Sequence, residues 1–236
     1  MTWRAAALLA LGPMLIAPAP ALAQAYQCTP PQRFDPVRPI RPDGPPRRVP
    51  IAGYTLAASW SPEYCRRPQD KASMQCSGAN GRFGFVLHGL WPEAGSGPPP
   101  QWCSMTLRPS AQVIRRNLCM TPVPWLLEHE WAKHGSCMAS TPEAYYRAAG
   151  ALWRSLRWPD ADRLSRQDGL TAGDLRRAFV ERNPDWKPEQ VGLLASDTGW
   201  LREVHLCYGR DFMPAACDRQ SFGHADSATL KIWRGL

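Results

Sequence analysis

The segment EHEWAKH, residues 128–134, places two histidines, two glutamates and a lysine within seven positions. On a helix that advances about 100° per residue, His129, Glu130, Lys133 and His134 lie within about 140° of one another, and the two residues between Glu130 and Lys133 point toward a core. Imidazoles exchange protons near neutral pH, and a lysine beside them can hold an anion. The segment could therefore be a metal site, a solvated helix face or an acid–base active site.

A zinc hydrolase built on His129, Glu130 and His134 is the first alternative to test. In H-E-x-x-H sites the two histidines are four positions apart, so both rings reach one ion. Here they are five apart, and Lys133 would add a cation among the ligands. The spacing therefore favours an anion over a metal, and we expect neither a metal nor another cofactor.

Phosphoryl transfer in RNA suits this set of groups better. Attack of the 2′-OH on the adjacent phosphorus needs a general base, a general acid and cations for the phosphorane. His88, in the apolar segment FVLHGLWPE, is the candidate acid from across the phosphate. Gly89 permits close approach and Trp91 offers a stacking surface. The alternative is that His88 is packed at a strand end and Trp91 belongs to the core, which is the commoner fate of a lone strand histidine.

Two segments resemble the active-site signatures of the T2-type ribonucleases. HGLWP stands at residues 88–92, and EHEWAKHGSC follows at residues 128–137. Weaker similarities are SWSPEYC at 59–65 and the alternating EVHLCY at 203–208. The resemblance runs from about Tyr54 to Cys217. It implies an α+β fold with a central antiparallel sheet and an endoribonuclease that needs no metal.

The resemblance also implies a role for each matching residue. His134 would be the general base for the 2′-OH and His88 the general acid for the 5′-oxygen, with these roles reversed in the second step. Glu130 and Lys133 would stabilise the phosphorane, and Glu130 would also orient His134. The expected reaction on single-stranded RNA leaves 2′,3′-cyclic phosphates and then 3′-phosphates. DNA, which lacks the 2′-OH, should not be cleaved.

Substrate-binding roles follow from the same resemblance. His129 would bind phosphate, and Trp91 with Glu93 would form the wall of a base site. Ser59 stands where many members of the family have glutamine, so a base preference does not carry over and broad base specificity is expected. The rival from another class is a non-catalytic, RNA-binding or toxin-like descendant of the same fold.

The first 23 residues read as a secretory signal. They combine an early arginine, an apolar stretch broken by prolines and a final Ala-Leu-Ala, and the stretch is too short to span a bilayer. We expect a periplasmic or secreted monomer without a membrane anchor. The formal charge of +8 suits RNA as a partner, but it equally suits plain surface solubility.

Eight cysteines follow the signal, and an even number in an exported chain predicts up to four disulfides. The resemblance implies three of the pairs, and the two remaining cysteines make a fourth: Cys65–Cys76, Cys103–Cys137, Cys207–Cys217 and Cys28–Cys119.

The mature chain divides into two parts, an N-terminal arm and the domain whose strands and helices must position these residues. Residues 24–50 are rich in proline and arginine and are expected to form an extended arm, and residues 51–236 the catalytic domain. Strands are predicted at 51–60, 82–91 and 200–208, and helices at 110–118, 122–134, 141–156 and 170–183, with Gly135 ending the second helix. Because strands and helices do not alternate regularly, the pattern favours an α+β fold. His205 and His224 are expected at the surface.

Overall fold

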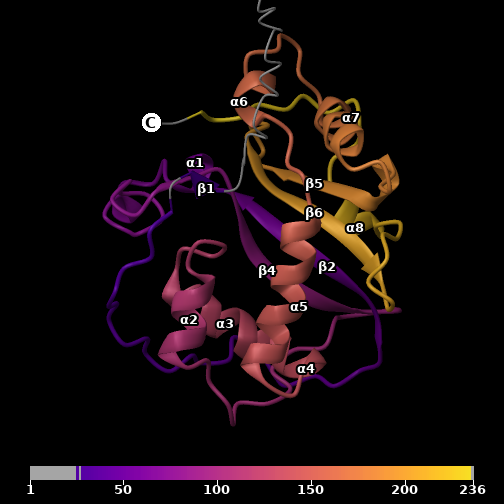
Figure 1. The fold of residues 1–236 in the computed structure, drawn as a ribbon. Coiled ribbons are helices and arrows are strands. Elements are labelled where there is room, and N and C mark those ends of the chain that lie inside the picture. The colour runs from indigo at the N-terminus through magenta and orange to yellow at the C-terminus, as the bar shows by residue number, and fades with distance from the viewer. Residues whose placement is uncertain (1–24, 27, 235–236) are drawn as a thin grey trace, which may run out of the picture.

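The computed structural model describes residues 25–26 and 28–234, so the expected signal at 1–23 lies outside the described residues. A four-stranded antiparallel sheet in the order β4-β2-β6-β5 forms the centre (Figure 1). Its strands are β2 (Ile51–Trp60), β4 (Phe85–Ala94), β5 (Val191–Ala195) and β6 (Leu201–Gly209). Two short strands, β1 (Ala25–Tyr26) and β3 (Arg82–Phe83), form a separate pair.

Helices surround this sheet. They are α1 (Ser61–Tyr64), α2 (Ala111–Asn117), α3 (Pro124–Glu130), α4 (Ser136–Met138), α5 (Pro142–Ser155), α6 (Ala161–Leu164), α7 (Ala172–Arg182) and α8 (Arg219–Phe222). Short 3₁₀ turns occupy Pro68–Asp70 and Pro188–Gln190. The side chains of Ser110, Thr141 and Thr171 accept backbone N–H groups at the starts of α2, α5 and α7, as polar residues do at helix N-termini. The predicted α+β fold is confirmed.

The two faces of the sheet have different environments because side chains alternate along a strand. On β2, Leu56, Ala58 and Trp60 pack into the core cluster that also contains Tyr145 and Trp153 of α5. Figure 1 shows α5 running across this face. The opposite face of β2 carries smaller, more polar residues, and it is the face on which the candidate site lies.

The predicted helix over 122–134 is irregular. After α3, residues Trp131–Gly135 form a π-helical turn, and the helix continues through α4 to Met138. Gly135 does not end it: its φ of −59° and ψ of −37° are helical. A Cβ at Gly135 would lie 2.7 Å from the Trp131 ring and 2.8 Å from the Tyr145 ring, so close packing is what requires glycine there. Single π turns often occur at functional sites.

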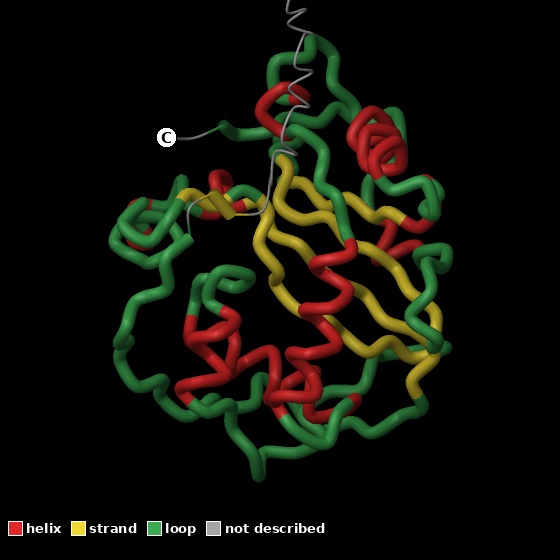
Figure 2. The backbone as a smooth tube through the Cα atoms, viewed as in Figure 1, coloured by secondary structure: helices red, strands yellow, loops and turns green. Residues whose placement is uncertain are grey.

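Other boundaries also differ from prediction. β4 extends to Ala94, and β5 was not predicted because five apolar residues without alternation give a weak strand pattern. Residues 28–50 contain no helix or extended strand and run around α2 and α3 toward β2 (Figure 2). None of the helices in the described ranges is long and apolar enough to cross a membrane.

Four disulfides staple the fold, and their pairing is the one stated above. Cys28–Cys119 ties the arm to the end of α2 across 91 residues. Cys103–Cys137 ties the loop after β4 to α4, directly behind the π turn. Among the described residues no cysteine is free.

Candidate active site

His88 is the extra residue of a β-bulge in β4. Its neighbours Leu87 and Gly89 pair with Ala58 and Ala57 of β2, and His88 itself has no partner in that ladder. An inserted residue kinks the strand and re-aims the side chain, which is why bulges recur beside active sites. The bulge turns His88 onto the face opposite the α5 core.

Glu203 of β6 holds His88 from the neighbouring side of the sheet. The Glu203 Oε1 atom lies 2.6 Å from His88 Nδ1 and accepts a hydrogen bond of 2.9 Å from Ser59 Oγ. Its Oε2 atom lies 3.0 Å from Nε2 of His205. Because Glu203 occupies Nδ1 of His88, Nε2 is the nitrogen left to face the site.

Glu130, at the end of α3, approaches His88 from the other side. Its carboxylate accepts the Trp91 indole N–H at 2.7 Å, and its Oε1 lies 3.5 Å from His88 Nε2. The Glu130 residue is 2% exposed. A Cβ at Gly89 would lie 2.0 Å from Glu130 Oε2, so the close approach that Gly89 allows is that of the carboxylate.

His134 completes the cluster from the π turn. Its ring lies 5.5 Å from that of Trp91, and the His88 ring lies 5.1 Å from Trp91 on another side. His134 Nδ1 is buried without a hydrogen-bond partner among the described residues. The orienting contact expected from Glu130 is absent there, because that carboxylate is engaged by Trp91 and His88 and the wider π turn separates positions 130 and 134.

The two histidines have opposite protonation preferences. Burial alone would lower the pKa of His88, but the hydrogen bond to Glu203 and the charges of Glu130 and Glu203 raise it to about 9. Burial, with the positive charges of Lys133, His129 and His88, lowers the pKa of His134 to about 3. At neutral pH His88 is therefore protonated and His134 neutral.

The pKa values of the two carboxylates beside His88, Glu130 and Glu203, are also shifted in opposite directions. Burial raises the pKa of Glu130 to about 7, although the positive charge of His88 and the Trp91 hydrogen bond act against it. Burial would also raise the pKa of Glu203, but hydrogen bonds to His205 and His88 outweigh that effect and place this pKa well below its usual range. Glu203 is thus the permanently charged partner of His88.

Lys133 and His129 lie on the outer side of the cluster. Lys133 Nζ forms a 2.6 Å ion pair with Asp43 of the N-terminal arm, and Asp43 also accepts the Trp102 indole N–H at 3.0 Å. The His129 ring stacks on Trp125 at 5.0 Å. Burial, followed by the positive charge of Lys133, lowers the pKa of His129.

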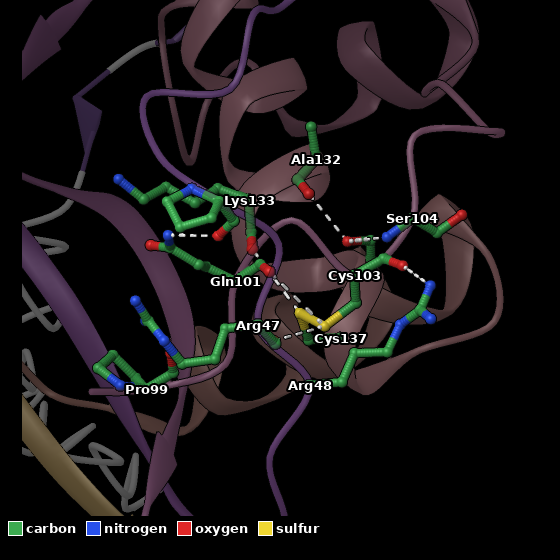
Figure 3. Close-up of a disulfide and its surroundings, with 11 residues drawn as sticks. Arg47, Arg48, Pro99, Gln101, Cys103, Ser104, Ala132, Lys133 and Cys137 are labelled. Atoms are coloured by element: carbon green, nitrogen blue, oxygen red, sulfur yellow. Dashed lines mark hydrogen bonds between the residues drawn. A yellow bond between two sulfur atoms is a disulfide. The ribbon is translucent and has the colours of Figure 1, made fainter. Parts of the chain in front are cut away.

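The backbone around Lys133 is fixed from several directions. Trp102 N–H donates to the Lys133 carbonyl at 2.8 Å, and Ser136 Oγ donates to the Ala132 carbonyl at 2.8 Å. Figure 3 shows the Cys103–Cys137 bridge beside Lys133. Catalytic geometry of this kind depends on such support.

Three further predicted residues, Glu93, His205 and His224, differ in how they lie relative to the cluster. Glu93 lies on the strand face that carries Trp91, is half-buried and hydrogen-bonds to Thr55, and burial raises its pKa. His205 was expected at the surface and this was wrong: it is 6% exposed, contacts the Trp91 ring edge at 5.4 Å and pairs with Glu203. It is covered because the Trp91 ring lies against it and because Ser221 of α8 packs over Gly192, its partner on β5. His224 is half-buried and takes no part in the cluster.

Sequence reasoning missed Glu203 and Asp43. Glu203 and His205 are two positions apart on a predicted strand, so they share a face, and this alternation was the available signal. Asp43 lies within a proline-rich arm and carried no signal. Within the described ranges, no group of three or more His, Cys, Asp or Glu side chains is arranged to hold a metal ion.

The fold is that of a disulfide-stapled α+β protein with a partly buried histidine and carboxylate cluster on one face of its sheet. Comparisons with known proteins show its class. A model of the ribonuclease T2 family matches residues 52–168. A ribonuclease of Aeromonas hydrophila is 37% identical over 164 residues, which cover 67% of this chain and 72% of the relative. The chain belongs to the ribonuclease T2 family.

Two further proteins are similar to this chain, the first in sequence and the second in fold. A probable ribonuclease of Haemophilus influenzae is 32% identical over 183 residues, which cover 72% of this chain but 62% of the relative, so the chain spans less than two thirds of that protein. The solved structure of an RNase-related protein from Calystegia sepium superposes with a TM-score of 0.60 at 17% identity, covering 78% of this chain and 98% of that one.

Proposed function

We propose that this protein is an endoribonuclease that cleaves single-stranded RNA by attack of the 2′-OH on the adjacent phosphorus. The observation that carries the proposal is the pair of imidazoles around Trp91. One is charged and held by a carboxylate, and the other is neutral, with a buried Nδ1 that has no hydrogen-bond partner among the described residues. Two like groups whose pKa values are pushed apart mark an acid and a base.

In the first step, neutral His134 takes the proton of the 2′-OH. The 2′-oxygen attacks phosphorus, and the bond to the 5′-oxygen of the next nucleotide breaks. Protonated His88 gives its Nε2 proton to that leaving oxygen. The 3.5 Å separation of His88 Nε2 from Glu130 is long for a hydrogen bond, so this proton remains available for transfer. The products are a 2′,3′-cyclic phosphate and a free 5′-OH.

In the second step the roles reverse. His88, now neutral, takes a proton from water, water oxygen attacks phosphorus, and His134 protonates the departing 2′-oxygen. The product is a 3′-phosphate. These two steps need no metal because the substrate supplies the first nucleophile and the two imidazoles carry every proton.

The neighbouring residues stabilise charge and bind substrate. Lys133 lies one residue from His134 and offers an ammonium group to the phosphorane, and His129 offers an imidazole to a phosphate oxygen. Glu130, with its raised pKa, can donate a hydrogen bond when protonated, and it holds the Trp91 indole. Trp91 and Glu93 form the wall of a base site, and broad base specificity is expected.

The end groups of digested RNA test this mechanism. We expect 2′,3′-cyclic phosphates early and 3′-phosphates later, full activity in EDTA, and no cleavage of the same sequence as DNA. Loss of activity on adding EDTA, restored by zinc, would replace the mechanism by a metal one. A folded wild-type protein that binds RNA but never cleaves it would instead be the non-catalytic binder.

We also propose that the protein acts as a monomer in the periplasm or outside the cell. Four disulfides persist in an oxidising compartment, which supports export. Fractionation of the producing cells and a sedimentation measurement test the two statements separately.

A further inference from the structure

A cavity of about 670 Å³ adjoins the candidate active site on the His88 side. Ser59 and Glu203 form part of its wall. These are the same two side chains that hydrogen-bond to each other, and Glu203 also holds His88. The cavity and the proposed general acid are therefore separated by a single side chain, that of Glu203.

Besides Glu63 and smaller residues, the wall contains arginines and aromatic rings, among them Tyr64, Arg66, Arg67, Trp200 and Arg202. The guanidinium of Arg67 lies 4.2 Å from the Tyr64 ring centroid, and that of Arg66 lies 4.9 Å from the Trp200 centroid. Grooves that bind single-stranded nucleic acid use this combination, since cations meet phosphates and ring faces stack on bases.

The three arginines differ in how far the protein already uses them. Arg66 pairs with Glu63 at 3.1 Å and Arg67 with Asp70 at 2.8 Å. Arg202 is exposed and forms no side-chain hydrogen bond or ion pair with any residue of the described ranges. A cation in a concave wall that pairs with none of the described side chains is the group most open to an anionic ligand.

The position of these cations indicates which phosphate they would meet. The cleaved phosphate must reach both His88 and His134, so it lies at the Trp91 cluster, on the other side of Glu203. His88 protonates the leaving 5′-oxygen, so the leaving nucleotide departs on the His88 side, toward this cavity. A cation there can serve the next phosphate along the chain.

We propose that this cavity binds the RNA chain downstream of the cleaved bond, with Arg202 at the second phosphate and Trp200 as a stacking surface for the base beyond that phosphate. The proposal rests on the proposed function. The basic and aromatic surface continues past Trp200, where Lys231 Nζ lies 5.7 Å from the Trp200 centroid and the Trp233 ring lies 5.7 Å away. Longer RNA would therefore gain from contacts that a dinucleotide lacks.

Substrates with a single ribonucleotide in an otherwise 2′-deoxy chain test the proposal, because each has one cleavable bond. One is a dinucleotide, the second carries three extra nucleotides downstream, and the third carries three upstream. For the wild type we expect kcat/KM to rise about tenfold or more with the downstream extension, a gain of the size that stacking and a phosphate contact provide. The upstream extension should give a smaller gain.

The variants are Arg202→Ala and Trp200→Leu, with Arg147→Ala as the matched control. Arg147 is exposed on α5, which covers the opposite face of the sheet. Both test variants should lose at least fivefold of the downstream gain while cleaving the dinucleotide at the wild-type rate. Arg202→Ala should also reduce the salt slope of oligonucleotide binding by about 0.7, the contribution of one phosphate on a single strand.

The outcomes separate the inference from the function beneath it. Equal downstream gains in wild type, Arg202→Ala and Trp200→Leu would overturn the inference and leave the endoribonuclease standing. If the wild type cleaved none of the substrates, the proposed function would fail. Fluorescence anisotropy with the all-2′-deoxy oligonucleotide would then test whether the cavity binds a nucleic acid chain. Weaker binding by Arg202→Ala than by Arg147→Ala supports the proposed binding site, and equal binding rejects it.

Discussion

The two halves of the histidine cluster, the sheet half around His88 and the helix half around His134, have opposite electrostatic environments. On the sheet half, His88 lies between two carboxylates: Glu203 of β6 is 2.6 Å from Nδ1, and Glu130 reaches toward Nε2 from the end of α3. The helix half places His134 among cations, buried and without a partner for Nδ1. The same side chain is therefore charged on one side of Trp91 and neutral on the other. Environment, and not residue type, decides which histidine is suited to be acid and which base.

Removing either imidazole should have the largest effect on this comparison. We expect His88→Ala and His134→Ala each to lower kcat on a dinucleotide by ~10² to 10⁴, the usual contribution of a positioned acid or base. Steady-state kinetics on a dinucleotide measures the loss, and circular dichroism controls for folding. Near wild-type activity in both variants would show that the acid and base lie elsewhere.

Replacing Glu203 should bring the pKa of His88 closer to that of His134. In Glu203→Gln the pKa of His88 should fall from about 9 toward the ordinary 6.5, because the carboxylate that favours the charged ring is gone. At pH 8 the protonated fraction, and with it the first-step rate, should fall about 30-fold, with a smaller loss at pH 6. The pH–rate profile measures this, and an unmoved alkaline limb would mean that Glu203 only supports the fold.

The free energy of unfolding should also depend on pH through the titration of His88. Because folding raises the pKa of His88, its stabilising contribution is complete below about pH 6.5 and is lost as pH rises through about 9. The difference in free energy of unfolding between wild type and Glu203→Gln should therefore shrink over that window, as urea titrations at several pH values would show.

Gly89→Ala tests the contact that joins the halves. The new Cβ would lie 2.0 Å from Glu130 Oε2, so the carboxylate must move away from Trp91. We expect a loss of about 1–3 kcal/mol in stability, as for other overpacked sites, together with lower kcat. Gly95→Ala is the matched control, since a Cβ there would meet its nearest neighbour at an ordinary 3.5 Å. Equal stability of the two variants would mean that Glu130 shifts freely.

Asp43→Asn should have the smallest effect, on the helix half alone. It removes the ion pair to Lys133, whose charge would then act undiminished on a bound phosphate. We expect KM for RNA to fall about two- to threefold and stability to change by less than about 1 kcal/mol, because Asp43 is 55% exposed. Asp35→Asn, elsewhere on the arm, should change neither. A raised KM would show that the arm assists binding.

Much of this architecture could be predicted from local pattern. β2 begins and ends at the predicted residues, and the polar caps at Ser110, Thr141 and Thr171 mark three helix starts. The prediction for position 135 is wrong because glycine serves both as a helix end and as a site of close packing, and the two are distinguished by the Trp131 and Tyr145 rings that pack against it. The bulge at His88 likewise depends on the register with β2, which no local pattern encodes.

The sequence by itself determined the groups that two of its segments bring to the candidate site. The types and order of residues in HGLWP and EHEWAKHGSC resemble those of the family and supply three imidazoles, two carboxylates and a lysine, because each residue type carries the same functional group in any fold. The tertiary structure alone decided their states. Glu203 and Asp43 reach the site from segments 115 and 90 residues away from their partners, and burial and charge, which act through space, set each pKa.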